Sequence, residues 1–230
     1  MSPAVSLILF DIDGTLLRGA GPHHKDALVE GVRRVTGLST TFEGIDTAGQ
    51  LDRDLIVTLL RAGGVNEQEI PPVLAEILTA CRQCYGANCA PDLSGFVCKG
   101  AREALIEFRA RGAVLALVTG NLSEIGWRKM ELAGLRHFFS LGTFSEDGAT
   151  RAELARMAAF RAREQDLVSS DCRVSLIGDH AKDIQAARAN GFQSVAVASG
   201  AMTAAALARF APDILLNDLS ELDFRAIMDG

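Results

Sequence analysis

The fold is decided by one stretch, Leu7-Ile8-Leu9-Phe10-Asp11-Ile12-Asp13-Gly14-Thr15-Leu16, in which an apolar run ends abruptly in two carboxylates. Residues 5–10 are apolar with little alternation, which predicts a β-strand covered on both faces, as in a parallel sheet between two layers of helices. In an open parallel sheet, ligands bind beyond the carboxyl ends of the strands. We therefore expect Asp11 and Asp13 at the mouth of a site, with Gly14 allowing the chain to turn sharply away.

Composition and charge restrict the class of protein. At 230 residues, of which 48% are hydrophobic, the chain has room for one α/β domain with a smaller insert. The net charge of −6 argues against a nucleic-acid or anionic-membrane partner, because both favour basic surfaces. No apolar stretch reaches membrane-spanning length, and the sequence begins without a charged leader. We expect a soluble cytoplasmic protein.

The five cysteines do not indicate a disulfide framework, because their number is odd and the chain is large. Cys81, Cys84 and Cys89 are close enough in sequence for a zinc site, helped by Cys98, but no histidine lies nearby and no second Cys-x-x-Cys follows. Reduced thiols on or after a helix are the favoured interpretation, with zinc as the minor alternative.

From residue 101 onward, helical and strand patterns alternate strictly. The segments with helical spacing are residues 101–109, 123–132, 151–164, 181–189, 203–209 and 219–228. Between them lie the predicted strands 113–118, 138–143, 173–177, 193–198 and 213–216. This alternation predicts an α/β fold with a doubly wound parallel sheet, similar to a Rossmann fold.

A long helical segment separates the first strand from the second. A strand–helix–strand unit needs only about 30 residues, yet the next convincing strand begins at residue 113, and helices are predicted over 23–35, 52–61 and 67–85. A loop of that length is not expected in a compact domain. We therefore expect an α-helical cap domain, residues 17–97, inserted into a core formed by residues 1–16 and 98–230 and lying over the site.

Polar groups follow two further predicted strands. Thr119-Gly120-Asn121 comes directly before a predicted helix, and a hydroxyl, an amide and the free N–H groups of a helix start make a cradle for an anion. Asp179 ends another strand, and Asp183 follows four residues later on the next helix. Between these two segments, Arg151 lies in the first turn of a helix that begins with a capping box.

Several carboxylates at one sheet edge cannot all be ionised unless a cation neutralises them. Oxygen ligands select a hard ion, and a site that also handles phosphate favours Mg²⁺. A metal beside an anion cradle and a spare carboxylate is a phosphoryl-transfer arrangement, in which one aspartate can be the nucleophile and another the acid or base.

These three motifs, in this order and spacing, resemble those of the haloacid dehalogenase superfamily. The resemblance covers the whole chain, and it implies a Rossmann-like core with a helical cap inserted after the first strand. It also implies that Asp11 is the nucleophile that forms an aspartyl-phosphate. Asp13 would be the general acid for the leaving alcohol and then the base for the attacking water.

The same resemblance implies the binding groups. The phosphoryl oxygens would be held in the turn that contains Gly120, by Thr119 together with the backbone N–H groups of Asn121 and Ile12. Magnesium would be bound by the Asp11 carboxylate, the Asp13 backbone carbonyl and Asp179. Asp183 would support this site from behind.

One position departs from the family pattern, which usually has a lysine between the second and third motifs. No lysine lies between Lys129 and Lys182. We expect Arg151 to take this role, because residues 144–151 are similar to an arginine variant in phosphatase-like members. Arg156 is the rival, although a solvated helix face explains it equally well.

The predicted cap contains further polar residues. His23 and His24 could approach substrate, but we favour a position at the surface, because they begin a helix beside Pro22. Asp52 faces substrate or simply caps a helix, and the sequence does not separate these alternatives. His180 follows a proposed catalytic aspartate in a short loop and is as readily a bystander as a contact for the leaving group.

Together these features predict a magnesium-dependent phosphatase for a small phosphorylated metabolite, resembling the phosphoglycolate phosphatases of the superfamily. A sugar phosphomutase of the same superfamily is the alternative. A haloacid dehalogenase is disfavoured, because that branch lacks the second acid of the first motif and needs no metal. A non-catalytic phosphate-binding protein is disfavoured because it has no need for both nucleophile and acid. The substrate and the oligomeric state stay open.

Overall fold

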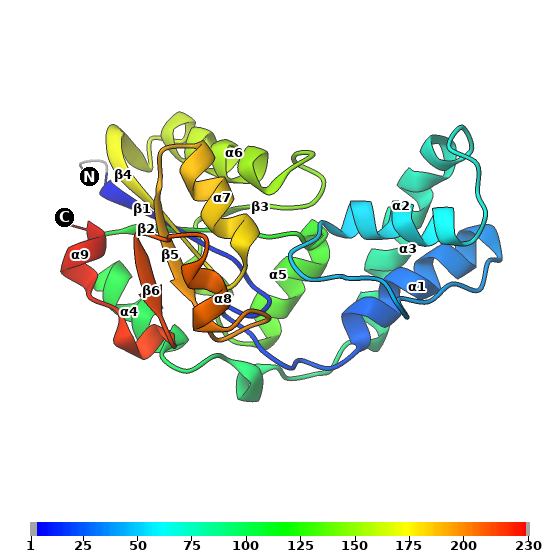
Figure 1. The fold of residues 1–230 in the computed structure, drawn as a ribbon, viewed down its shortest axis with the longest axis horizontal. Helices are drawn as coiled ribbons and strands as arrows, with labels where there is room; N and C mark the ends of the chain where they lie inside the picture. Colours follow the sequence, from blue (N-terminus) through cyan, green and yellow to red (C-terminus); the bar gives the residue numbers. More distant parts are fainter. Residues whose placement is uncertain (1–3, 229–230) are drawn as a thin grey trace.

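The computed structural model describes residues 4–228, and its centre is a six-stranded parallel sheet with the strand order β3-β2-β1-β4-β5-β6 (Figure 1). The strands are β1 (Ala4–Phe10), β2 (Val114–Val118), β3 (Leu141–Thr143), β4 (Val168–Gly178), β5 (Gln193–Val197) and β6 (Ile214–Leu216). This order confirms the predicted doubly wound α/β fold. Because β1 lies between β2 and β4, the order reverses there, where such sheets bind ligands.

Helices cover both faces of this sheet. The core helices are α4 (Ala101–Ala110), α5 (Ser123–Leu132), α6 (Arg151–Glu164), α7 (Ala181–Ala189), α8 (Ala204–Ala208) and α9 (Phe224–Met228). Three 3₁₀ turns accompany them: η1 (Ser94–Phe96), η2 (Arg136–Phe138) and η3 (Leu219–Glu221). Residues Leu7 and Leu9 of β1 pack with the alanine-rich faces of α6 and α7, while Ile8 and Phe10 pack with α4 on the other side. The strand is buried on both faces, which explains its lack of alternation.

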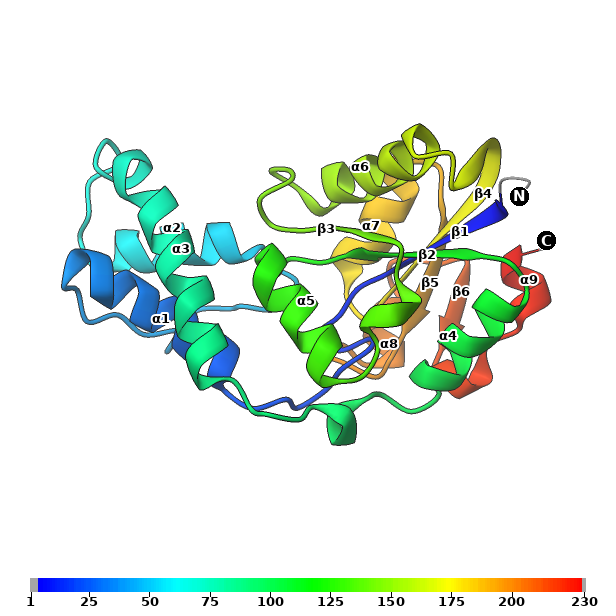
Figure 2. The same ribbon diagram turned by 180° about the vertical axis from the view of Figure 1, so that it is seen from behind.

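Three helices between β1 and α4 form a separate group: α1 (His23–Thr36), α2 (Asp52–Ala62) and α3 (Ile70–Asn88). They stand apart from the sheet in both ribbon views (Figures 1 and 2). Their hydrophobic cluster, which includes Leu28, Leu59 and Ile77, extends to Leu122 and Ile125 at the start of the core helix α5. The segments leading into and out of this group run side by side, since the Arg18 N–H donates to the Phe96 carbonyl and the Cys98 N–H to the Leu16 carbonyl, both at 2.9 Å. The boundaries at residues 17 and 97 stay a prediction.

Four predicted elements had boundaries that differ by three residues or more from the structure. The strand predicted over 138–143 begins only at Leu141, after the turn η2. The segment 219–228 is not one helix, because the backbone leaves helical geometry at Leu222 and the Asp223 carboxylate starts a new helix by accepting the N–H groups of Arg225 and Ala226. The strand predicted over 173–177 begins at residue 168, where it continues pairing with β1 across an irregularity. The helix predicted over 67–85 begins at Ile70, with two prolines in its first turn.

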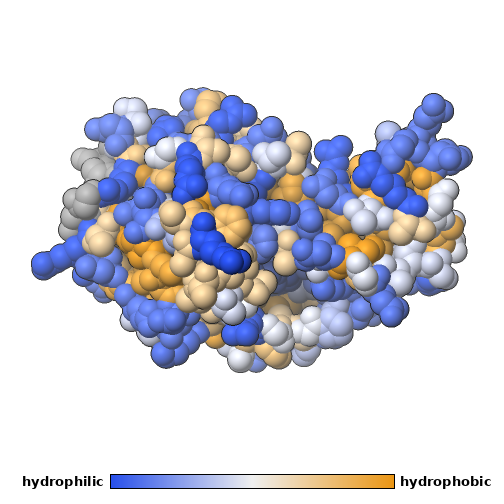
Figure 3. Space-filling view, in the orientation of Figure 1, coloured by the Kyte–Doolittle hydropathy of each residue, from blue (hydrophilic) through white to orange (hydrophobic). Residues whose placement is uncertain are grey.

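The outer surface is mostly hydrophilic on the face in Figure 3, with apolar residues over the edge of the sheet. There β6 has no further strand beside it, and Leu215 is exposed. No helix within residues 4–228 is long and apolar enough to cross a membrane.

The contact between α1 and α3 depends on Gly31, and this gives a test of the fold. A Cβ at this position would lie 2.8 Å from the Cys81 backbone nitrogen, so the two helices would have to separate. We expect Gly31→Ala to lower the free energy of unfolding by about 1–3 kcal/mol, as overpacking does. Gly86 of α3 is the matched control, because a Cβ there meets open space. Gly86→Ala should instead stabilise by up to about 1 kcal/mol. Equal effects in urea unfolding would contradict this packing.

Candidate active site

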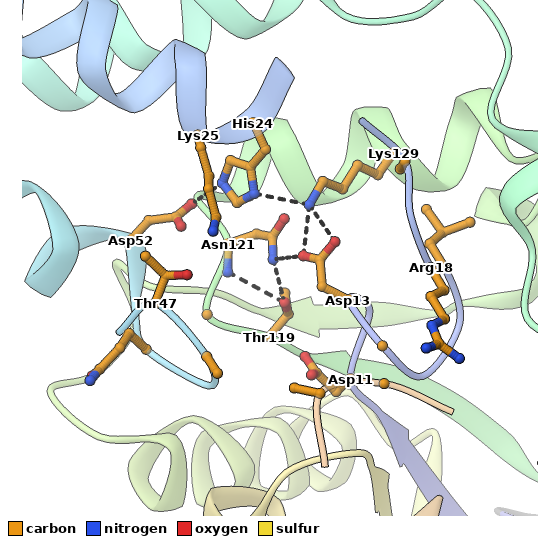
Figure 4. Close-up of a pocket in the computed structure, with 18 of the residues that line it drawn as sticks. Asp11, Asp13, Arg18, His24, Lys25, Thr47, Asp52, Thr119, Asn121 and Lys129 are labelled. Atoms are coloured by element: carbon orange, nitrogen blue, oxygen red, sulfur yellow. Dashed lines mark hydrogen bonds and ion pairs between the residues drawn. The ribbon is translucent and has the colours of Figure 1, made fainter. Parts of the chain in front are cut away.

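A cavity of about 490 Å³ lies between the carboxyl ends of the central strands and the helices α1 and α2 (Figure 4). Seven residues predicted from the sequence line it: Asp11, Asp13, Thr119, Gly120, Asn121, Arg151 and Asp179. Asp183 lies just behind the cavity wall. Ile12 does not line the cavity, since its side chain is completely buried in the core. We expected only the backbone N–H of Ile12 to take part in the site, by donating to a phosphoryl oxygen.

Three carboxylates are crowded at the floor of this cavity. Asp11, Asp179 and Asp183 are all buried, and each offers an oxygen within 4.8 Å of the others. Within residues 4–228 this is the only group of three acidic, histidine or cysteine residues close enough to share a metal ion. The cysteines considered for zinc are therefore not gathered into a comparable site.

Burial and mutual repulsion disfavour the charged forms of these acids. Burial is the largest cause that raises the pKa of Asp11 to about 6, against the lowering effect of Arg151, with Asp183 and Asp13 adding repulsion. Burial also raises the pKa of Asp179 to about 7, and the neighbouring Asp11 and Asp183 contribute. A divalent cation would remove this repulsion, so the donor set fits a hard metal ion such as Mg²⁺.

The geometry distinguishes between the acids that could hold such an ion. Both oxygens of Asp183 are engaged, Oδ1 with Arg151 at 2.8 Å and Oδ2 with the His180 N–H at 3.1 Å. Asp179 accepts one hydrogen bond, from the Ala201 N–H at 2.8 Å. Asp11 and Asp179 thus keep carboxylate oxygens that a metal ion could use, whereas Asp183 contacts Arg151 and the His180 N–H.

Two glycines make room for Asp179. A Cβ on Gly14 or on Gly200 would overlap its carboxylate. Gly14 also has a φ of +91°, a conformation that side chains disfavour, and this allows the sharp turn after Asp13.

Arg151 provides the positive charge that faces Asp11. Its Nη1 lies 2.9 Å from Asp11 Oδ1 and 2.8 Å from Asp183 Oδ1. The side chain is buried and held at the start of α6, where Thr150 caps the helix by accepting the Glu153 N–H. Arg156, the rival, is exposed two turns into the same element and does not line the cavity.

The turn after β2 is held by its own side chains. Thr119 Oγ1 accepts from the Asn121 N–H at 3.3 Å and from Asn121 Nδ2 at 2.8 Å, and Nδ2 also donates to Asp13 Oδ2 at 2.8 Å. Asn121 Oδ1 is a buried oxygen without a partner. A buried oxygen that lacks a hydrogen-bond partner beside a cavity is consistent with a ligand or water molecule that donates to it. Gly120 lets the loop before α2 approach, because a Cβ there would collide with the Gln50 carbonyl.

Lys129, which is buried in α5, was not predicted to belong to the site. Its Nζ lies 2.6 Å from Asp13 Oδ2 and 2.7 Å from Oδ1. A signal was present in the sequence. Lys129 comes four residues after Ile125, which is also buried, so this cation lies on the buried face of its helix.

The prediction for His24 was wrong. The start of α1 turns toward the core, so the imidazole lines the cavity with 19% of its side chain exposed. Its Nε2 lies 2.8 Å from Asp52 Oδ2, and its Nδ1 lies 3.0 Å from Lys129 Nζ. Asp52 itself is buried and accepts the Leu122 N–H at 2.7 Å, so its carboxylate stands at the start of α5 in the core.

Backbone contacts hold the α1–α3 group against the core. The Asp52 N–H donates to the Gly120 carbonyl at 2.8 Å, and the Arg53 N–H donates to Ser145 Oγ at 2.9 Å. Lys182 Nζ also donates to Gln50 Oε1 at 2.8 Å. His180 packs against Gly49 of the same loop and does not line the cavity.

Comparison with known proteins agrees with this architecture. A model of the haloacid dehalogenase-like hydrolase family matches residues 5–191. The chain is 27% identical over 223 residues to a phosphoglycolate phosphatase of Synechococcus elongatus, covering 94% of each protein. It is 25% identical over 236 residues to a phosphoglycolate phosphatase of Pseudomonas putida, covering 97% of this chain and 79% of that protein.

Two solved structures illustrate the likeness in fold. A β-phosphoglucomutase from Clostridium difficile superposes with a TM-score of 0.69 at 16% identity, covering 99% of this chain and 96% of that chain. A protein described as a predicted phosphoglycolate phosphatase from Haemophilus somnus gives a TM-score of 0.66 at 20% identity, covering 94% and 95%. The family model spans the site segments described above, from β1 to the end of α7. The chain belongs to the haloacid dehalogenase-like hydrolases.

Proposed function

We propose that this chain is a magnesium-dependent phosphatase that hydrolyses a small phosphomonoester through an aspartyl-phosphate on Asp11. One observation carries the proposal. Asp11 is buried between a cation, Arg151, and a second acid, Asp179, at the floor of a cavity that also exposes Asp13. A nucleophile, a charge-neutralising group and an acid or base are then within one site. The names of the curated relatives support the same activity.

In this proposal, Asp11 attacks phosphorus, and the leaving alkoxide takes a proton from Asp13. Water then attacks phosphorus in the aspartyl-phosphate while Asp13 accepts its proton. The bond between phosphorus and the Asp11 oxygen breaks, so that inorganic phosphate leaves and the Asp11 carboxylate is restored. Arg151 offsets negative charge on Asp11 and the phosphoryl group throughout. Mg²⁺, held by Asp11, Asp179 and the Asp13 carbonyl, would stabilise charge on the phosphoryl oxygens when bound.

The ion pair with Lys129 determines which form of Asp13 is present. The Asp13 side chain is 47% exposed to the cavity, yet the surrounding protein separates it from bulk water, which would raise its pKa. The Lys129 ammonium and the hydrogen bonds from Lys129 and Asn121 outweigh this desolvation and lower the pKa to about 2. In the observed arrangement Asp13 is therefore a carboxylate, suited to act as the base. Acting as the acid requires it to gain a proton, which the negative charge of a bound phosphate ester would favour by raising the pKa of Asp13.

Two cations in the cavity support a substrate with a second anionic group. Arg18 and Lys25 line the cavity, and Lys25 extends into it from α1 (Figure 4). Neither side chain forms an ion pair or a hydrogen bond with another side chain in the part of the chain that is described. An unpaired ammonium and guanidinium opposite the phosphate site suit a carboxylate. Phosphoglycolate, an ester that bears one, is therefore our proposed substrate class.

The alternatives are weaker. The phosphoglucomutase likeness is at 16% identity and concerns the fold, so a mutase is supported by no residue-level observation. A dehalogenase has no need for Asp13, which here makes contacts with both Asn121 and Lys129.

The first test asks whether turnover requires the nucleophile Asp11 and the metal ion. With 2-phosphoglycolate, phosphate release should require Mg²⁺ and fall by at least about a thousandfold in Asp11→Asn, because loss of a nucleophile leaves little beyond binding. Glucose phosphates in the same assay test the mutase, which would yield an isomerised sugar instead of free phosphate. Equal turnover with EDTA, or in Asp11→Asn, would refute the mechanism.

The second test is the stability of the metal-free protein. The raised pKa values of Asp11 and Asp179 mean that their stabilising contribution is complete below pH about 4 and is lost as the pH rises through about 6 to 7. We expect Mg²⁺ to raise the melting temperature at pH 8 and much less at pH 5, where protons compete. At a hundred times its Kd, the ion adds about 2.7 kcal/mol. Asp179→Asn is the control that should abolish this gain. An equal shift at both pH values would contradict the assignment.

The third test concerns substrate choice. Lys25→Met should raise the KM for 2-phosphoglycolate about ten- to a hundredfold, the cost of about 1.5–3 kcal/mol for a lost charged hydrogen bond. The KM for p-nitrophenyl phosphate, which lacks a carboxylate, should stay nearly constant. Arg34→Met on the same helix is the matched control, since Arg34 is exposed and pairs only with Glu30. A parallel rise for both substrates would exclude carboxylate recognition by Lys25.

A further inference from the structure

Lys129 is an unusual residue for its position, because its side chain is 3% exposed in a helix of the core. A buried ammonium has three N–H donors and needs an acceptor for each. The structure provides three acceptors: Asp13 Oδ1 at 2.7 Å, Asp13 Oδ2 at 2.6 Å and His24 Nδ1 at 3.0 Å. Two come from the core, and the third comes from α1.

This contact also assigns the proton on His24. An ammonium can only donate, so Nδ1 of His24 accepts, and its N–H is at Nε2, pointing at Asp52 Oδ2 at 2.8 Å. Asp52 in turn accepts the Leu122 N–H at the start of α5, the helix that carries Lys129. The chain of contacts therefore leaves the core at Lys129, passes through α1 and α2, and returns to the same core helix.

We propose that Lys129 is a positioning residue for Asp13, and that His24 makes this positioning depend on the docking of the α1–α3 group against the core. The inference rests on the proposed function, in which Asp13 is the acid and base.

The geometry explains how such positioning would work. Lys129 contacts both carboxylate oxygens and Asn121 contacts one of them, so rotation of the Asp13 side chain is restricted. The Asp13 side chain is otherwise 47% exposed to the cavity, and no other side chain within residues 4–228 forms an ion pair or a hydrogen bond with it. If α1 moves away, the buried ammonium loses its third acceptor, which is costly. Lys129 then shifts, and Asp13 loses its fixed position.

The test uses the dependence of rate on the leaving group. General acid catalysis matters for an alkyl phosphate, whose leaving alkoxide needs a proton, and little for p-nitrophenyl phosphate. Lys129→Met should lower kcat/KM for ethyl phosphate by about ten- to a hundredfold, a part of the 10²–10⁴ that acid–base catalysis supplies. The ratio kcat/KM reports on transfer of the phosphoryl group to Asp11 and not on the later hydrolysis that both substrates share, so kcat/KM for p-nitrophenyl phosphate should change by less than about threefold. Arg128→Met is the control, because Arg128 is the adjacent residue, exposed and paired with Glu131.

A double-mutant cycle separates positioning from a general loss of structure. If Lys129 acts through Asp13, adding Lys129→Met to Asp13→Asn should cost almost nothing more with ethyl phosphate. Should Lys129→Met prove unstable by circular dichroism, Lys129→Arg replaces it in the same cycle, because it keeps the charge and changes the geometry. Multiplying losses, or equal losses with both substrates, would overturn the proposal.

The role of His24 is tested in the same assay. His24→Leu removes the third acceptor and should give the same dependence on the leaving group, with a smaller loss than Lys129→Met. His24→Asn restores an acceptor and should recover part of the rate. An unchanged rate in His24→Leu would remove docking of α1–α3 from the proposal. If the wild-type protein released no phosphate from any ester, the proposed function itself would fail, which is a distinct outcome.

Discussion

The repulsion among Asp11, Asp179 and Asp183 is the constraint on which the site depends. Three buried carboxylates with oxygens within 4.8 Å of one another would destabilise any fold unless positive charge were placed among them. Arg151 supplies one such charge, and it is shared between Asp11 and Asp183. Among the described residues, the remaining acid, Asp179, accepts a hydrogen bond only from the Ala201 N–H. The three carboxyl groups together can therefore carry more negative charge than Arg151 neutralises, at the place where a metal and a phosphoryl group would meet.

The sheet topology concentrates these charges. Because β1 lies between β2 and β4, its carboxyl end is next to two others, so residues far apart in the sequence converge. The convergence also needs space, which Gly14, Gly120 and Gly200 provide. The first and the last accommodate Asp179, and Gly120 accommodates the loop before α2. The glycine of the opening motif thus serves the second acid as well as the turn.

The part of the site predictable from the sequence is the part that follows directly from strand ends. Asp11, Thr119 and Asp179 could be predicted because a strand's carboxyl end fixes their place, and Arg151 because a capping box fixes the helix start. Lys129 and His24 could not be predicted in the same way. Their role depends on how α5 and α1 are rotated and packed in the fold. Hydrophobic periodicity shows only which face of a single helix is buried and not which other helix that face contacts. The division of residues 219–228 was missed for a similar reason, because a single aspartate, Asp223, starts the second helix.

The two proposed catalytic aspartates are held in different ways. Asp11 contacts Arg151, which contacts Asp183, and all three belong to the core. Asp13 contacts Lys129, which contacts His24 of α1, and His24 contacts Asp52 of α2. The ion pairs of the nucleophile that the structure describes therefore lie within the core, whereas those of the acid and base extend to α1 and α2. In such an arrangement the phosphoryl acceptor stays ready in every state of the enzyme, and proton transfer is organised only when the substrate is covered and water is excluded.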